Sequence, residues 1–163
     1  MLYVQGPPDT SVTQERLLGA QEAMGAGFDL RMVAGQWTEE SGEKSVQAFL
    51  RLKTSELFVP RVVASQNDAM ALGARRAVSG LADRERKQAW SDAAYAGCDG
   101  LPEGGQKLVR EGKLAATVVT PSNAGPAVDI VAEVLRTGRP ALAQLVLKPV
   151  SCPDLSTIRP LRS

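Results

Sequence analysis

The chain has 163 residues, 19 lysines and arginines against 18 acidic residues, and no histidine. This length suits one domain with a sizeable core, and the net charge of +1 predicts neither a nucleic-acid surface nor a polybasic membrane patch. The absence of histidine excludes Ser-His-Asp and Cys-His catalysis and removes the commonest metal ligand. No apolar run has the length of a transmembrane helix, and residues 1–10 lack the features of a signal peptide.

Alternating strands and helices are expected along the whole chain. In chain order they are a strand at 2–5, a helix at 11–24, a strand at 30–34, a helix at 38–53, a strand at 61–64, a helix at 68–80, a charged helical excursion at 82–92, a strand at 93–97, a helix at 102–112, a strand at 115–119, a helix at 122–138 and a strand-like run at 145–150.

Several boundaries carry recognisable signals. Ser11 with Gln14 fits a capping box, and residues 25–27 (Gly-Ala-Gly) end that helix. Thr38 precedes two acids that complement the start of the next helix. Pro102 suits the first position of a helix. The charged excursion is predicted to be solvated, with Trp90 as a local packing residue.

The alternation predicts an α/β fold, a three-layer sandwich with a mainly parallel sheet and right-handed crossovers, formed by residues 1–163 as one lobe. Neither a Gly-x-Gly-x-x-Gly motif after a strand nor a P-loop lysine is present, so we expect no nucleotide cofactor. We expect no metal, because histidine is absent and the two cysteines are far apart. Cys98 and Cys152 form no C-x-x-C motif. They are expected either to be two small buried hydrophobes or to pair if the fold brings them together.

The stretch 65–74 is the most informative part of the sequence. It follows an apolar run and leads into a helical pattern, so it reads as strand, polar turn and helix. Asn67 stands at the junction, where its side chain can cap the helix. In a parallel sheet this turn lies at the carboxyl end of the strand, where ligands bind.

Four polar or aromatic residues follow four different strands: Arg16, Trp37, Asn67 and Asp99. A parallel sheet brings the segments after its strands to one edge. A guanidinium, a carboxamide, a carboxylate and a flat ring suit a sugar, whose hydroxyls and C–H face they contact. The set has no nucleophile, and the adjacent acids Glu39 and Glu40 fit a helix start, so binding without catalysis is predicted.

Motifs in the same order resemble the second lobe of periplasmic sugar-binding proteins of the ribose-binding type, and the related lactose-repressor-type regulators. The segments that carry the resemblance are Thr10-Ser11 with Arg16, Trp37, residues 66–74 (QNDAMALGA), residues 97–104 (GCDGLPEG), residues 112–117 (GKLAAT) and Gly125. The resemblance implies that Arg16, Asn67 and Asp99 hydrogen-bond a sugar and that Trp37 stacks on it. Thr120 is implied as a further polar contact, and Cys98 replaces a bulkier residue.

The resemblance further implies a sugar receptor that delivers its ligand to the membrane permease of an ABC transporter in the periplasm. The alternative is the effector-binding lobe of a lactose-repressor-type regulator, whose DNA-binding part would lie outside this lobe. A small α/β enzyme is a third class. In the family a first lobe closes over the ligand, and the matching part is not in this sequence.

The helix at 122–138 crosses to that first lobe in the family. Its apolar stripe, with Ala127, Val128, Val131 and Val134, is therefore expected to lose its partner. We expect the stripe either to fold back on this lobe or to be buried in a second copy, which would make a homodimer through this helix.

Overall fold

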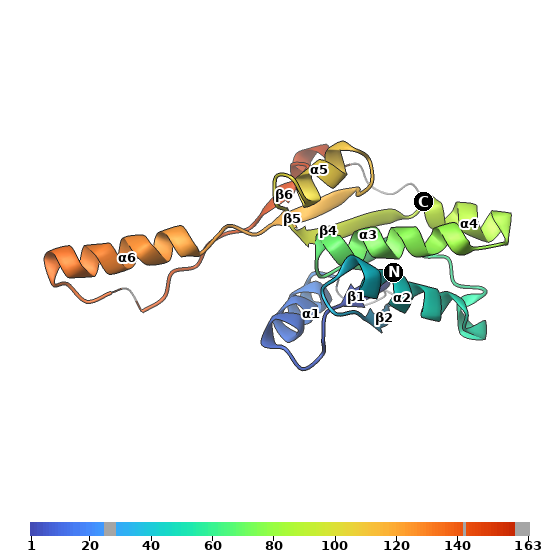
Figure 1. Cartoon of the computed structure of the whole chain (residues 1–163), viewed down its shortest axis with the longest axis horizontal. Helices are drawn as coiled ribbons and strands as arrows, with labels where there is room; N and C mark the ends of the chain where they lie inside the picture. Colours follow the sequence, from blue (N-terminus) through green and yellow to red (C-terminus); the bar gives the residue numbers. More distant parts are fainter. Residues whose placement is uncertain (25–28, 142, 159–163) are drawn as a thin grey trace.

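Six strands form a single sheet in the order β2-β1-β3-β4-β5-β6 in the computed structural model of the chain, which describes residues 1–24, 29–141 and 143–158 (Figure 1). The elements are β1 Leu2–Gln5, α1 Ser11–Met24, β2 Arg31–Ala34, α2 Glu39–Leu50, η1 Lys53–Ser55, β3 Val62–Ser65, α3 Asp68–Ala77, η2 Val78–Gly80, α4 Arg84–Ser91, β4 Ala94–Asp99, α5 Gly105–Arg110, β5 Ala116–Val119, α6 Ala124–Thr137, β6 Val150–Cys152 and η3 Leu155–Thr157.

The first five strands run parallel, and β6 pairs antiparallel with β5 at one edge. The predicted α/β fold with a mainly parallel sheet is therefore confirmed. Because the chain reverses its direction of travel across the sheet after β2, the carboxyl ends of β1 and β3 lie side by side. Such a switch point is where open α/β sheets place their ligands.

The two faces of the sheet are covered unequally. Leu2 and Val4 of β1 point into a core that α2 and α3 cover, where they join Val46 and Met70. Tyr3 points to the opposite face, where its hydroxyl donates to the Arg16 carbonyl of α1 at 3.2 Å. On this second face, which we call the α1 face, Tyr3 lies in register with three small side chains, those of Ala64, Ala96 and Ala116.

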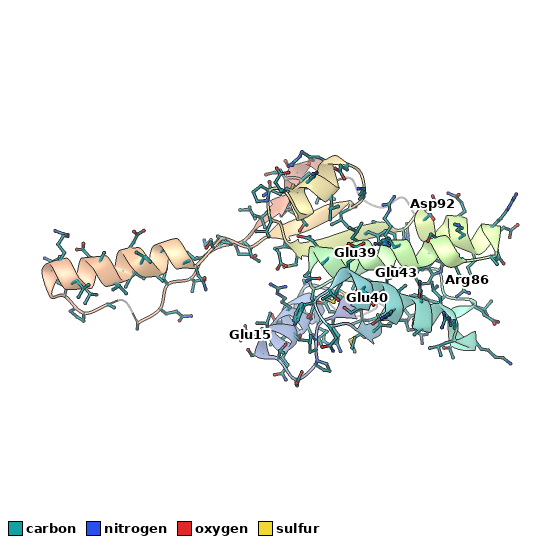
Figure 2. The ribbon with its side chains drawn as sticks, in the orientation of Figure 1. Glu15, Glu39, Glu40, Glu43, Arg86 and Asp92 are labelled. Atoms are coloured by element: carbon teal, nitrogen blue, oxygen red, sulfur yellow. The ribbon has the colours of Figure 1, made fainter. Side chains whose placement is uncertain are left out.

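Helices α2 and α3 cross so closely that glycines form the contact. A Cβ placed on Gly73 would lie 1.9 Å from the Glu39 carbonyl oxygen, and one on Gly42 would lie 2.5 Å from the Met70 carbonyl oxygen. At the surface, Arg76 of α3 forms ion pairs with Glu39 and Glu43, which Figure 2 labels on α2.

Helix α4 is more than the solvated excursion that its charges predict. Trp90 is fully buried in the core and packs against Phe49 and Phe58 with ring centroids 6.2 and 6.1 Å away. Arg86, labelled in Figure 2, reaches back from α4 and donates to the hydroxyl and carbonyl of Ser55. One tryptophan and one arginine thus attach this charged helix to the domain.

Three predicted boundaries are wrong. Thr10 rather than Ser11 caps α1, because the Thr10 hydroxyl accepts the Thr13 N–H at 3.3 Å. The helix expected to run to Lys53 ends at Leu50, and α5 begins at Gly105 after a turn instead of at Pro102. The predicted glycine end of α1, at residues 25–27, lies outside the described residues.

The end of the described chain departs from the expected strand at 145–150, since β6 comprises only Val150–Cys152. Both cysteines are free and partly buried, so the predicted alternative of a disulfide between them is not what the structure shows. Within the described residues, no helix has both the length and the apolar character needed to cross a membrane.

Helix α6 stands apart from the sheet and the other helices, on two extended segments (Figure 1). It begins and ends close to the predicted bounds, with Gly138 in the left-handed conformation at its end (φ 66). None of its residues is buried. Of the two expected alternatives, the one in which its apolar stripe folds back on this lobe is therefore not what the structure shows.

Candidate functional site

Four of the five predicted binding residues meet at the carboxyl edge of the sheet. Arg16 comes from the second turn of α1, Trp37 precedes α2, Asn67 caps α3 and Asp99 ends β4. Together with Thr10 and Val12 they line an open hollow of about 340 Å³, which we call the edge hollow. The structure thus brings these four side chains together, while the ligand they hold stays a prediction.

An ion pair spans the edge hollow. An Arg16 guanidinium nitrogen lies 3.1 Å from an Asp99 carboxylate oxygen, and their side chains remain 28% and 39% exposed. Another guanidinium nitrogen donates to the Gln66 carbonyl, and the guanidinium carbon lies 5.7 Å from the centre of the Trp37 ring. Arg16 is therefore held on several sides and keeps an exposed portion for a ligand.

Trp37 occupies a backbone conformation that large side chains rarely adopt, with φ 64. Its ring packs against Gly6, where an added Cβ would come within 2.2 Å of it. A left-handed conformation at a non-glycine residue costs free energy of order 1 kcal/mol and is concentrated at functional sites. Here the conformation turns the ring toward the edge hollow, which Trp37 lines.

Asn67 is both a helix cap and a site residue. Its Oδ1 accepts the Met70 N–H at 2.9 Å, and its Nδ2 donates to the Trp37 carbonyl at 2.8 Å. A carboxamide has two donor hydrogens and two acceptor lone pairs, so one of each is left for a ligand. The hydrogen bond to Trp37 also ties the strained segment before α2 to the start of α3.

Asp68 has a structural role that the sequence analysis missed. Its buried carboxylate accepts the Gly100 N–H at 2.8 Å and the Thr117 hydroxyl at 2.5 Å. Burial raises the pKa of this carboxyl above its ordinary value of 3.8, although the two hydrogen bonds act in the opposite direction. The carboxylate fixes the turn that presents Asp99, whose own φ is 105.

Two glycines far from Asp68 in the sequence make room for its buried carboxylate. A Cβ on Gly97 or Gly105 would approach an Asp68 carboxylate oxygen to 2.3 or 2.1 Å. Glycine at both positions is therefore what admits the buried carboxylate. The spacing of glycines around Asp99 was visible in the sequence, but its connection to Asp68 was not.

Gln66 is a second missed residue, and its side chain is fully buried. Its Oε1 accepts the Gly6 N–H at 2.9 Å, and its Nε2 donates to the Thr13 carbonyl at 2.9 Å. Gln66 thereby joins the end of β3 to the loop before α1. Because its backbone carbonyl also accepts from Arg16, it fixes the position of that guanidinium.

Thr120 lies outside the edge hollow. Its hydroxyl donates to the Asp99 carbonyl at 3.3 Å, and its side chain lines a different hollow on the α1 face of the sheet. The structure therefore does not bring Thr120 together with Trp37 and Asn67.

This second hollow, the α1-face hollow, measures about 620 Å³. Its lining includes Tyr3, Ala20, Ala64, Ala96, Cys98 and Val118. Cys98 thus widens this hollow instead of the edge hollow, and burial raises the pKa of its thiol. Among the residues that the structure describes, no group of three or more cysteine and acidic side chains is placed to hold a metal ion.

Comparisons with known proteins agree with this geometry. Residues 1–139 match the model of the periplasmic binding protein domain. The ribose import binding protein RbsB of Salmonella typhimurium (strain LT2) is 36% identical over 118 residues, which make up 72% of this chain and 36% of that protein.

Two solved structures show the same fold. The fructose binding periplasmic domain of a hybrid two-component system aligns with a TM-score of 0.76 at 20% identity, over 96% of this chain and 50% of that one. The binding protein of the arabinose ABC transporter from Shewanella sp. ANA-3, bound to α- and β-L-arabinofuranose, aligns with a TM-score of 0.69 at 26% identity, over 86% and 46%. The chain thus spans half or less of the length of these relatives.

Proposed function

Since the chain belongs to the periplasmic binding protein domain family, we propose that it binds a small sugar in the edge hollow, without catalysis. The observation that carries the proposal is the convergence of Arg16, Trp37, Asn67 and Asp99 from four different elements on one hollow. A charged pair supplies directional hydrogen bonds to hydroxyls, and the ring supplies an apolar surface for C–H groups.

We propose a five-carbon or furanose sugar as the ligand. The supporting relatives are the ribose import binding protein and the receptor bound to L-arabinofuranose. The edge hollow, at about 340 Å³, offers room for one sugar ring and little more.

The proposed cellular role is capture of that sugar in the periplasm for the membrane permease of an ABC transporter. The resemblance to an import binding protein at 36% identity supports this role. The alternative of a lactose-repressor-type effector lobe is not favoured, because the LacI family regulator in complex with lactose that shares the fold is only 24% identical, a likeness that supports the fold alone. In the proposed arrangement this chain supplies the second lobe of a two-lobe site, as residues 1–163, so the site it offers alone is one-sided.

The test is a titration of the chain with D-ribose, L-arabinose, D-fructose, D-galactose and myo-inositol, followed by the NMR signal of the Trp37 indole N–H. Because a one-sided site excludes water poorly, we expect a dissociation constant on the order of millimolar for the preferred sugar. Trp90, which is buried in the core, provides the internal control signal that should not move.

Two variants make the test specific to the edge hollow. Asp99→Asn should weaken binding by roughly 10- to 100-fold, because it removes a charge-assisted hydrogen bond. Glu103→Gln removes an exposed carboxylate from the same loop and should leave binding unchanged. Equal losses in both variants, or no shift of the Trp37 signal with any sugar, would refute the proposal.

A further inference from the structure

The turn after β4 carries the only Asp-Gly pair of the chain, Asp99–Gly100, and the sequence contains no Asn-Gly pair. A glycine that follows an aspartate leaves its backbone nitrogen unshielded, because it has no Cβ. This nitrogen can attack the side-chain carboxyl carbon of the aspartate before it. Asp-Gly is therefore the pair at which aspartate most readily rearranges to isoaspartate, and here its aspartate lines the edge hollow.

Both residues of the pair are required where they stand. Gly100 adopts φ 62, and a Cβ on it would lie 2.6 Å from the Val119 Cα. Asp99 forms the ion pair with Arg16 across the edge hollow. Because the turn needs the glycine and the edge hollow uses the carboxylate, the fold carries a reactive pair at this place.

The peptide group between Asp99 and Gly100 is held at both ends. Its oxygen, the Asp99 carbonyl, accepts the Thr120 N–H at 3.1 Å and the Thr120 hydroxyl at 3.3 Å. Its N–H donates to the buried Asp68 carboxylate at 2.8 Å. We call Asp68 and Thr120 the turn clamp. Since Arg16 engages the Asp99 carboxylate at 3.1 Å, the attacking nitrogen and the carbon that it would attack are held by different partners.

We propose that Asp99–Gly100 is a site of spontaneous isoaspartate formation, and that the turn clamp keeps it unreacted while the chain is folded. The φ of 105 at Asp99 supports a clamp, because a strained backbone persists only where its surroundings hold it. Opening of this turn, either locally or through unfolding of the whole chain, releases the Gly100 nitrogen and allows the reaction.

The reaction needs no reagent besides water. The Gly100 nitrogen forms a bond to the Asp99 side-chain carboxyl carbon, a C–O bond of that carboxyl breaks, and the hydroxyl leaves as water with the amide proton. The product is a cyclic succinimide. Water then adds to one of its two carbonyl carbons and breaks the C–N bond there. Opening at the former backbone carbonyl gives isoaspartate, and opening at the other carbonyl returns aspartate.

A consequence for sugar binding rests on the proposed function. Isoaspartate carries the main chain through the former side chain, so the free carboxylate arises from the former backbone carbonyl. This carboxylate no longer starts from the position at which Asp99 meets Arg16, and a chain that has reacted should lose its affinity for sugar. The rearrangement is measured without sugar, so its failure and the failure of the proposed function are separate results.

The test compares the native chain folded in buffer with the same chain unfolded in guanidinium chloride, both incubated at neutral pH and at one temperature. Peptide mapping by mass spectrometry with electron-transfer fragmentation quantifies isoaspartate at each aspartate. The unfolded chain should accumulate it at residue 99 ahead of its other aspartates. The folded chain should react at least about tenfold more slowly at this residue, because the turn must open first.

Two variants locate the protection, and circular dichroism checks that each is folded. Asp68→Ala removes the acceptor of the Gly100 N–H and should speed the reaction in the folded chain. Val46→Ala weakens the buried core away from the turn and should leave the rate at the native value. Hydrogen exchange in the native chain keeps the test decisive if Asp68→Ala does not fold. The Gly100 amide should exchange at least about tenfold more slowly than that of Gly125, which lies in the first turn of α6.

Several results would overturn the proposal. An unfolded chain without isoaspartate at residue 99 would mean that the pair is not a reactive site. Equal rates in the folded and unfolded chains, or equally fast exchange of the two glycine amides, would mean that the turn clamp gives no protection. A faster reaction in the folded chain would mean that Asp68 draws off the Gly100 proton and promotes the attack. Equal acceleration by Asp68→Ala and Val46→Ala would assign the protection to overall stability.

Discussion

A single carboxylate, Asp68, holds together the backbone on which the site depends. It joins the start of α3 to the turn at Gly100 and to Thr117 of β5. Gly97 and Gly105 pack so closely against it that a Cβ at either position would lie within 2.3 Å of a carboxylate oxygen. Asp68 therefore acts through the fold, whereas the adjacent Asn67 caps α3 and lines the edge hollow.

Asp68→Asn should destabilise the chain by about 1–3 kcal/mol, because the amide cannot accept both hydrogen bonds. The measurement is urea unfolding monitored by circular dichroism at neutral pH. Glu103→Gln, at an exposed position, serves as the control and should change the unfolding free energy little. An unchanged midpoint in Asp68→Asn would mean that the two hydrogen bonds are replaced without cost.

The raised pKa of Asp68 predicts that the stability of the native chain, compared with Asp68→Asn, depends on pH. Burial raises the pKa of Asp68 in the folded chain above its ordinary value of 3.8. Between the pKa of Asp68 in the unfolded chain and its higher pKa in the folded chain, the folded chain binds more protons than the unfolded chain. The contribution of Asp68 to the unfolding free energy therefore falls as pH rises through this window. The difference between the native chain and Asp68→Asn should therefore be largest at acid pH, narrow as pH rises through this window and stay constant above it.

Unfolding curves of both chains at a series of pH values from acid to neutral test this. A difference that widens with rising pH would show the opposite sign, meaning that hydrogen bonding outweighs burial at Asp68 and lowers its pKa.

At the scale of elements, the crossing of α2 and α3 depends on the absence of two side chains. Gly42 and Gly73 let the helix backbones meet at distances that a Cβ would prohibit. The close crossing places the start of α2, with Trp37 just before it, beside Asn67 at the start of α3. The geometry of the edge hollow is thus partly set by glycines that do not line it.

Gly73→Ala should destabilise the chain by about 2 kcal/mol or more, although alanine ordinarily favours a helix over glycine by about 1 kcal/mol. The matched control is Gly19→Ala in α1, where an added Cβ meets nothing within 4 Å. That variant should gain about 0.5–1 kcal/mol. Thermal and urea unfolding of the two variants would show opposite shifts, and shifts of the same sign would contradict the account.

The attachment of α4 makes a separate prediction. Trp90→Ala should cost about 3–5 kcal/mol, because it empties a fully buried position between Phe49 and Phe58. Glu85→Ala on the exposed side of α4 should change stability by less than about 0.5 kcal/mol. Comparable losses in both, measured by urea unfolding, would mean that α4 contributes through its charges instead.

The sequence predicts the parallel sheet and the edge hollow because both follow from local pattern. Short apolar runs predict the strands, and a polar segment follows each of them. A parallel sheet then brings these polar segments together at one edge. The roles of Gln66 and Asp68 were not predictable, since their partners lie 60 residues away at Gly6 and 32 residues away at Gly100. The misplaced strand at 145–150 has a similar cause, because an apolar run indicates burial or pairing but not which of its residues reach β5.

At the scale of the whole molecule, the proposed sugar site lies in an open hollow at one edge of the sheet. The aligned part of the chain covers half or less of each relative described above. Affinity for a sugar in such a site depends on what covers it, since closure removes water from the polar groups and strengthens their hydrogen bonds.

The chain contains two tryptophans, and they lie in contrasting surroundings. Trp37 lies half-exposed beside Arg16 in the edge hollow, while Trp90 is enclosed among phenylalanines. Indole emission depends on the polarity around the ring, so one excitation wavelength reads two independent events. Occupancy of the hollow would alter the red component from Trp37, and unfolding would shift the blue component from Trp90. The fluorescence of Trp37 can therefore report sugar binding and that of Trp90 can report unfolding of the core, without an added label.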